Sequence, residues 1–317
     1  MPIRRASLLA EQLGQLHEAM TEEGNLSTML HRLSDSAGAL QAAERAIDLW
    51  RRQGEPGGVT SGAVHMRAGV YYLSAGRYAD ALAAFELALP MFGAGQAGVW
   101  ANYTEHHLAR LWLALGQTAR AQRLLSPLPA DAPHSLRNKR LMVLARIARQ
   151  TGKLRAETLS EGLVFTQDVY GPDRFDAQLM LASVLPPADA LSLCDELLPS
   201  ARHQYPAAAK HAHVRRADCL RRLGRHAEAA AAAREALAMT DTTPLELTPP
   251  EFWWLVYQAL DAADAGAEAQ AVLQTAMAWL DAAQRHVPPE FLESFRQRNP
   301  EHRALLLRGQ AVQPSNA

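Results

Sequence analysis

Helix-like stretches of apolar residues, broken by charged and polar ones, run along most of the chain, and in five places one glycine separates two such stretches. These glycines are Gly76, Gly116, Gly152, Gly224 and Gly266. Their spacings are 40, 36, 72 and 42 residues, and the longest step has its midpoint at the proline turn of residues 186–189. A further step of 38 residues leads back to Gly38. The pattern predicts about seven helical hairpins, because glycine adopts the left-handed backbone that ends a helix without a steric cost.

Small residues recur at fixed distances from these glycines, which is the pattern expected where the two helices of a hairpin touch. Seven residues before them stand Gly69, Ala109, Ala145, Ala217 and Ala259. Five residues after them stand Ala81, Ala121, Glu157, Ala229 and Ala271, and twelve after them Ala88, Leu128, Val164, Ala236 and Ala278. A repeat of helical hairpins accounts for all three columns.

Composition agrees with an all-α protein, since 60 of 317 residues are alanine and only 6% are aromatic. No apolar run reaches the roughly 18 residues of a membrane span, and Glu11 interrupts the N-terminal segment before it reaches signal-peptide length. Two cysteines, Cys194 and Cys219, are too few for a disulfide framework, so we expect both to be reduced and packed. A cytoplasmic location is the resulting expectation.

The segment from Gly69 to Leu89 resembles a tetratricopeptide repeat: Gly69 and Tyr72 match the small and aromatic positions of its first helix, and Ala81, Phe85 and Ala88 those of its second. The repeats at Gly116 and Gly224 match in a similar way. The repeat at Gly152 departs at Glu157 and Glu161. The resemblance implies an all-α, right-handed superhelical α-α solenoid with a C-terminal capping helix.

The steps of 36 to 42 residues exceed the 34 of a tetratricopeptide unit and resemble the MalT-like sensor regions of bacterial ATP-dependent transcription regulators. The segment 287–306 resembles the closing segment of such arrays, which a solenoid needs to cover its last apolar face. We therefore expect an N-terminal helix over 1–22, a repeat array over 23–285, a cap over 286–308 and a flexible tail over 309–317.

Gly93, Gly95 and Gly98 form G-x-G-x-x-G, the pattern of a dinucleotide-binding loop. Such a loop must follow a strand, whereas this one follows a helical stretch, so a linker between hairpins is expected. No G-x-x-x-x-G-K-[ST] loop occurs. The pairs His106–His107 and His211–His213 are poorly spaced for sharing one metal ion on a helix. No catalytic motif stands out, and the expectation is a protein that is no enzyme and has no cofactor or metal.

In several predicted hairpins the first of the two helices is basic, although the chain has a formal net charge of -1. Residues 137–150 hold five basic side chains and no acid, and residues 213–222 hold four basic side chains and one acid in addition to His213. The resemblance implies that first helices line a concave groove. Its inward positions correspond here to Tyr103, His106, Arg110, Lys139, Met142, Arg146, Arg149, His211, Asp218, Arg221 and Trp253.

These features favour a non-catalytic scaffold that binds a protein or peptide, with an acidic partner as the expectation. The carboxylate clamp of chaperone-binding relatives is missing, since Met66 and Val70 occupy its lysine and asparagine positions. The alternative is a ligand- or partner-sensing domain of a bacterial transcription regulator that lacks its own nucleotide-binding domain. RNA binding ranks lower because residues 137–150 contain no aromatic side chain for base stacking. The partner's identity and the oligomeric state are left open.

Overall fold

A computed structural model describes residues 2–33, 35–93, 97–125, 134–152, 172–240, 242, 244 and 246–312. The residues it describes are helical, in turns or in irregular connections and contain no strand, which confirms the predicted all-α class. The chain forms two compact units, residues 1–111 and 112–317. The helix α6 spans the boundary between them, and each unit is described separately.

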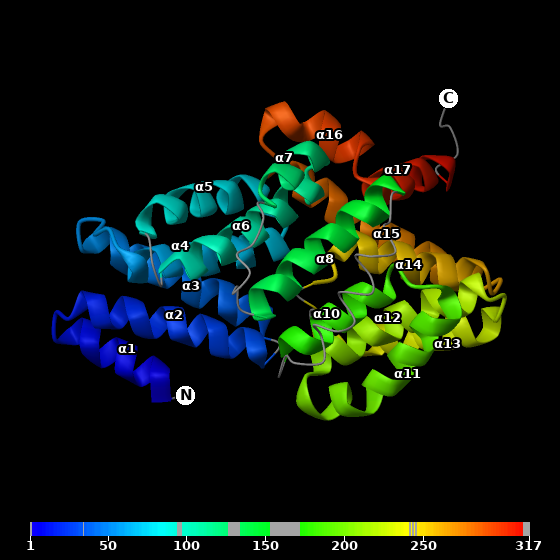
Figure 1. The fold of residues 1–317 in the computed structure, drawn as a ribbon, viewed down its shortest axis with the longest axis horizontal. Coiled ribbons are helices and arrows are strands. Elements are labelled where there is room, and N and C mark those ends of the chain that lie inside the picture. Colours follow the sequence, from blue (N-terminus) through cyan, green and yellow to red (C-terminus); the bar gives the residue numbers. More distant parts are fainter. Residues whose placement is uncertain are drawn as a thin grey trace. The chain divides into compact units, whose positions relative to one another are not determined.

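The first unit consists of paired antiparallel helices. Its helices are α1 (Pro2–Gln12), α2 (Leu16–Arg32), α3 (Ser36–Arg52), α4 (Val59–Ser74), α5 (Tyr78–Ala88), the short 3-10 helix η1 (Leu89–Met91) and α6 (Ala97–Ala114). Contacts join α2 to α3 and α4 to α5, and α2 also packs beside α4 (Figure 1). The expected N-terminal segment 1–22 therefore contains α1 and the first turns of α2.

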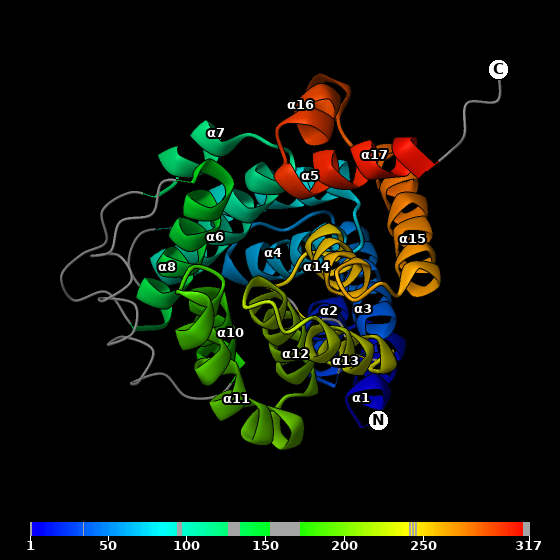
Figure 2. The ribbon, with the colours of Figure 1, turned by 90° about the vertical axis from the view of Figure 1, so that its right-hand side faces the viewer.

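The second unit continues the same architecture. Its helices are α7 (Thr118–Arg123), α8 (His134–Thr151), α10 (Pro172–Ala182), α11 (Pro187–Gln204), α12 (Pro206–Arg222), α13 (His226–Ala238), α14 (Pro249–Asp261), α15 (Gly266–Gln284), η2 (Pro289–Phe291), α16 (Leu292–Gln297) and α17 (Pro300–Val312). The pairs α10–α11, α12–α13 and α14–α15 are hairpins, and α12 packs beside both α10 and α14 (Figure 2). The turn predicted at residues 186–189 lies about three residues earlier: residues 183–185 form it, and α11 already starts at Pro187.

One hydrogen-bond pattern closes the hairpin turns. The residue after the turn donates its N–H to the carbonyl five residues earlier. This bond joins Arg77 to Tyr72 (2.8 Å), Gln117 to Trp112 (2.7 Å), Arg225 to Leu220 (2.9 Å) and Ala265 to Leu260 (3.0 Å). The residue before each donor has a positive φ: 75° at Gly76, 71° at Gly116, 76° at Gly224 and 57° at Asp264. This is the geometry that glycine was predicted to supply.

Two of the predicted turn glycines are wrong. Gly266 starts α15, and the left-handed position belongs to Asp264, two residues earlier. Gly38 lies in the first turn of α3, where its N–H donates to the Asp35 carboxylate (2.8 Å). Because aspartate tolerates the left-handed conformation better than most residues, a turn can form there without glycine.

When residues are counted from the corrected turns, buried alanines occupy the same positions in each hairpin. Asp35 makes the same bond to the Leu30 carbonyl (2.9 Å) before α3. Counting four residues on from each of the five donors leads to an alanine that is 0–2% exposed: Ala39, Ala81, Ala121, Ala229 and Ala269. Seven residues further along lie alanines that are 0–1% exposed: Ala46, Ala88, Ala236 and Ala276. The predicted positions Ala271 and Ala278 are exposed instead, because the Gly266 register was two residues late.

The small residues of the first helices allow close contact with the second helices. A Cβ atom built at Gly69 would lie 2.5 Å from Cε1 of Phe85, so no larger residue fits without a shift. Ala109, Ala145 and Ala217 at the equivalent positions are buried. The hairpin core thus depends on small side chains, whereas a right-handed superhelix stays a prediction.

The closing segment packs against two parts of the second unit. Its helix α17 contacts α14 and α15, the last hairpin of the array. Ser294 also donates a hydrogen bond to the Leu115 carbonyl (2.7 Å), and the Asn299 amide donates to the Leu113 carbonyl (3.3 Å). The Phe291 ring meets Trp112 edge to face, with centroids 5.3 Å apart. The segment therefore ties the last hairpin to the turn that follows α6.

Candidate functional site

The eleven predicted groove residues lie on four first helices. Tyr103, His106 and Arg110 belong to α6; Lys139, Met142, Arg146 and Arg149 to α8; His211, Asp218 and Arg221 to α12; and Trp253 to α14. The structure thus places all of them on the helices expected to line a groove. Whether they bind a ligand stays a prediction.

On α6, Tyr103 is partly exposed and lies 6.2 Å from the Trp100 ring, centroid to centroid. His106 and Arg110 are buried. A guanidinium nitrogen of Arg110 lies 3.1 Å from Nδ1 of His107, and the His106 and His107 rings are 4.9 Å apart. The face of α6 therefore combines aromatic, imidazole and guanidinium groups.

The remaining residues have varied surroundings. Lys139 is buried, and Met142 packs in the core of the second unit with Ala177 and Met180. Asp218 pairs with Arg221 (2.8 Å). Trp253 is half-buried with its ring edge against Phe252.

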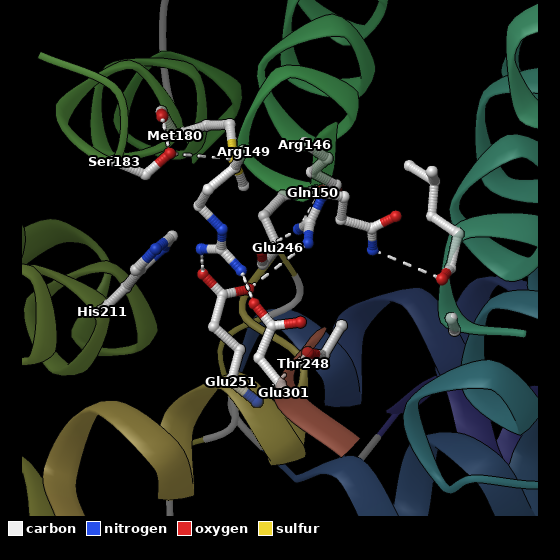
Figure 3. Close-up of polar contacts among 12 residues, drawn as sticks. Arg146, Arg149, Gln150, Met180, Ser183, His211, Glu246, Thr248, Glu251 and Glu301 are labelled. Atoms are coloured by element: carbon white, nitrogen blue, oxygen red, sulfur yellow. Dashed lines mark hydrogen bonds and ion pairs between the residues drawn. The ribbon is translucent and has the colours of Figure 1, made fainter. Parts of the chain in front are cut away.

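Arg146 and Arg149 belong to a network of ion pairs within the second unit, which we call the Glu251 cluster. Its members are Arg146, Arg149, Arg215, Glu246, Glu251 and Glu301. Glu251 is 1% exposed and accepts hydrogen bonds from Arg149 and Arg215. Arg149 also binds Glu301 of α17, as Figure 3 shows.

Arg146 of α8 is the remaining arginine of the Glu251 cluster. Arg146 donates to the backbone carbonyl of Glu246 and pairs with its carboxylate (3.2 Å). It also lies 3.6 Å from an oxygen of Glu251. Thr248 caps α14 by accepting a hydrogen bond from the backbone N–H of Glu251, and the positive end of the helix favours the carboxylate in its first turn.

The arginines of the Glu251 cluster change the pKa of Glu251 and, together with burial, that of His211. Burial by itself would raise the pKa of Glu251, but the neighbouring Arg149, Arg215 and Arg146 outweigh it and hold that pKa well below the ordinary value. His211, fully buried beside them, accepts a hydrogen bond from Nε of Arg215 (3.2 Å). Burial and the charge of Arg215 lower the pKa of His211, so it is neutral at pH 7.

The Glu251 cluster joins α8, α12, α14 and α17 through three arginines and three glutamates. The carboxylates that were expected from an acidic partner at Arg146 and Arg149 are here supplied by the chain itself. Sequence reasoning missed Arg215, Glu246, Glu251 and Glu301. Arg215 lies inside the basic segment 213–222, but its partner stands 36 residues later in another hairpin.

Several site classes can be assessed over the described part of the chain. There, no helix is long and apolar enough to cross a bilayer. No three His, Cys, Asp or Glu side chains in the same residues gather in a way that could hold a metal ion. Cys194 and Cys219 are both free and buried, as predicted, and burial raises the pKa of each thiol.

The loop with the three glycines follows helices rather than a strand. Phe92 and Gly93 come after η1, and Gly98 lies in the first turn of α6. Gly95 is outside the described residues. The helical surroundings on both sides agree with the predicted linker and do not provide the strand of a dinucleotide fold.

Comparison with known proteins places the resemblance in the first unit. Residues 17–94, which cover α2 from its second residue and all of α3 to α5, match the tetratricopeptide repeat family model. Among solved structures, the tetratricopeptide domain of P58(IPK) aligns at 15% identity over 98% of this chain and 99% of its own, with a TM-score of 0.25. A TM-score this low establishes no common arrangement of helices. No curated protein matches the sequence significantly. Residues 17–94 are therefore similar to tetratricopeptide repeats, and the described helices of both units form hairpins.

Proposed function

We propose that this protein is a non-catalytic scaffold that binds a segment of a partner protein along the first helices of its hairpins. The observation that carries the proposal is the common register of the turns and buried alanines, which sets first helices side by side. In unit 1, α2 packs against α4, and the family match covers both helices. Tetratricopeptide repeats generally mediate protein interactions, which supports this role.

Within this proposal, the first-helix face of unit 1 is the better candidate for the binding surface. In unit 2 the basic side chains Arg146 and Arg149 already bind glutamates of the same chain. Tyr103 on α6 is partly exposed and carries a ring suited to contact with a peptide. A cytoplasmic location and a role in a transcription regulator stay predictions.

Site-specific photo-crosslinking tests the proposal. A photoreactive phenylalanine derivative replaces Tyr103 on α6 in one variant and the exposed Glu86 on α5, a second helix, in a matched variant. Both proteins are expressed in the native cell and irradiated. We expect a discrete crosslinked partner from position 103 and none from position 86. Equal crosslinking at both positions, or none at either, contradicts the proposal.

A further inference from the structure

Arg67 has an unusual environment for a charged residue. It is the only arginine, lysine, aspartate or glutamate in α4, and it is partly buried. Its guanidinium carbon lies 5.8 Å from the centre of the Trp100 ring of α6. On the other side, its Nη1 reaches Gly24 of α2, where it would be 3.2 Å from an added Cβ. The side chain thus lies among the three first helices of unit 1.

Arg67 has no ion pair with any residue that the structure describes, and its burial lowers its pKa. Removing a guanidinium from water costs free energy unless a counter-charge compensates. The three arginines of the Glu251 cluster show what compensation looks like in this protein. An incoming carboxylate would supply the same counter-charge to Arg67.

Arg67 has aromatic neighbours, and Arg32 supplies a second positive charge near them. Tyr71 follows one turn later on α4, and the His31 ring of α2 lies 5.5 Å from the Tyr71 ring. The buried Nε2 of His31 has no hydrogen-bond partner among the described residues. Burial, then the charges of Arg110 and Arg32, lower the pKa of His31. We call His31, Arg32, Arg67, Tyr71 and Trp100 the Arg67 cluster.

Acidic side chains of unit 1 that form ion pairs do so elsewhere. Glu23 of α2 accepts a hydrogen bond from Ser7 and pairs with Arg45 of α3. Glu44 and Asp80 both bind Arg77, at the start of α5. The ion pairs described for unit 1 therefore involve Arg45, Arg52 and Arg77. Neither Arg32 nor Arg67 pairs with a carboxylate among the described residues.

We propose that the Arg67 cluster binds an acidic segment of the partner protein, with Arg67 as the central carboxylate-binding residue and Arg32 beside it. The inference rests on the scaffold function proposed above and specifies its ligand. The cation–π contact with Trp100 restrains the guanidinium, which lowers the entropy lost when it forms a forked hydrogen bond with a carboxylate. The Trp100 and Tyr71 rings would flank the bound segment.

A nucleic acid is the less favoured occupant of this surface. Residues 1–111 contain nine arginines and no lysine, against eleven aspartates and glutamates. Such a unit has no net positive field to attract a polyphosphate chain, and nucleic-acid binders are usually strongly basic. A short acidic peptide needs only the local charge of the cluster.

Fluorescence anisotropy with the full-length chain tests the inference. The probe is a labelled peptide of alternating glutamate and alanine, and the matched peptide has glutamine for glutamate. We expect only the glutamate peptide to bind, with an affinity that falls as salt is raised. Arg67→Gln should weaken binding about tenfold or more, and Arg67→Lys should weaken it less, because the charge remains but the fork is lost.

The control variant is Arg5→Gln, which removes one exposed charge from α1 of the same unit. It should change the dissociation constant less than about twofold. Circular dichroism verifies that each variant is folded, and Arg32→Gln provides a second, exposed test position if Arg67→Gln unfolds. Equal binding of both peptides, equal effects of Arg5→Gln and Arg67→Gln, or tighter binding of an oligouridine overturns the inference. Crosslinking at position 103 without glutamate-dependent binding would leave the scaffold function standing and reject its acidic ligand.

Discussion

Arg215 of α12 donates a hydrogen bond to Glu251 of α14, and both side chains are almost fully buried, at 2% and 1% exposed. Arg149 of α8 binds the same carboxylate and also Glu301 of α17. A single glutamate therefore ties first helices of three hairpins together in unit 2, and Arg149 extends the connection to the closing segment. This makes Glu251 a structural residue with large consequences for stability.

Glu251→Gln should destabilise the protein by about 3–5 kcal/mol, because it leaves the buried Arg146 and Arg215 and the partly buried Arg149 without their shared counter-charge. The matched control is Glu268→Gln, which removes the exposed pair between Arg234 and Glu268. That change should cost less than about 1 kcal/mol. Chemical denaturation followed by tryptophan fluorescence measures both. Similar losses for the two variants would show that burial of the Glu251 cluster has little energetic weight.

Acid should weaken the second unit in two stages. Burial lowers the pKa of His302 to about 4, opposed by its hydrogen bond with the Phe295 carbonyl. The unfolded chain takes up a proton near its ordinary pKa of 6.5 while the folded chain does not, so stability is full above that value and falls as the pH drops towards 4. His211 acts in the same direction. The depressed pKa of Glu251 adds a loss below its ordinary value of 4.5.

Between about pH 6.5 and 4 the His302 contribution amounts to at most about 3 kcal/mol. Thermal unfolding over this range measures it, and His302→Gln should flatten the dependence. A midpoint that is constant across the range, or the same slope in His302→Gln, would contradict the predicted protonation.

Two glycines with the same backbone conformation should differ in their tolerance of alanine. Gly116 and Gly224 both have a positive φ, so alanine costs roughly 1 kcal/mol at each. A Cβ at Gly116 would in addition lie 2.3 Å from the Ser294 carbonyl oxygen, whereas Gly224 has open space. Gly116→Ala should therefore lose more stability and increase hydrogen exchange in α16. Equal effects would mean that the closing segment does not pack on this turn.

The corrected register predicts opposite outcomes for two alanines of α15. Ala269 is 2% exposed, and Ala271 is exposed. Ala269→Leu should destabilise the protein by about 1–3 kcal/mol through overpacking, and Ala271→Leu by less than about 0.5 kcal/mol. Thermal unfolding compares them. If Ala271→Leu destabilised the protein more than Ala269→Leu, the positions counted from Gly266 would be the correct ones.

Local sequence signals were sufficient to predict the helical hairpins and most of their turns. Gly76, Gly116 and Gly224 mark turns because a positive φ is a local requirement that glycine meets most easily. Asp264 meets the same requirement without glycine, so a count of glycines alone shifted the register of the last hairpin. The hydrophobic and small-residue pattern is thus a good guide to fold class and a weaker guide to exact position.

The charged sites were harder to predict because their partners are distant in sequence. The basic pattern of residues 137–150 suggested an anion-binding surface, but Arg149 finds Glu251 and Glu301, which lie 102 and 152 residues later. Only tertiary packing brings these groups together. Arg67 escaped notice for the opposite reason, since it is a single charge in an apolar helix rather than part of a basic run.

The central claim, that first helices of unit 1 receive an acidic partner segment, is tested most directly by hydrogen–deuterium exchange of the full chain with and without the glutamate–alanine peptide. The account predicts slower exchange in α2, α4 and α6 on addition of the peptide, with α3 and α5 unchanged and no effect in Arg67→Gln. Protection confined to α3 and α5, or protection that persists in Arg67→Gln, would contradict it.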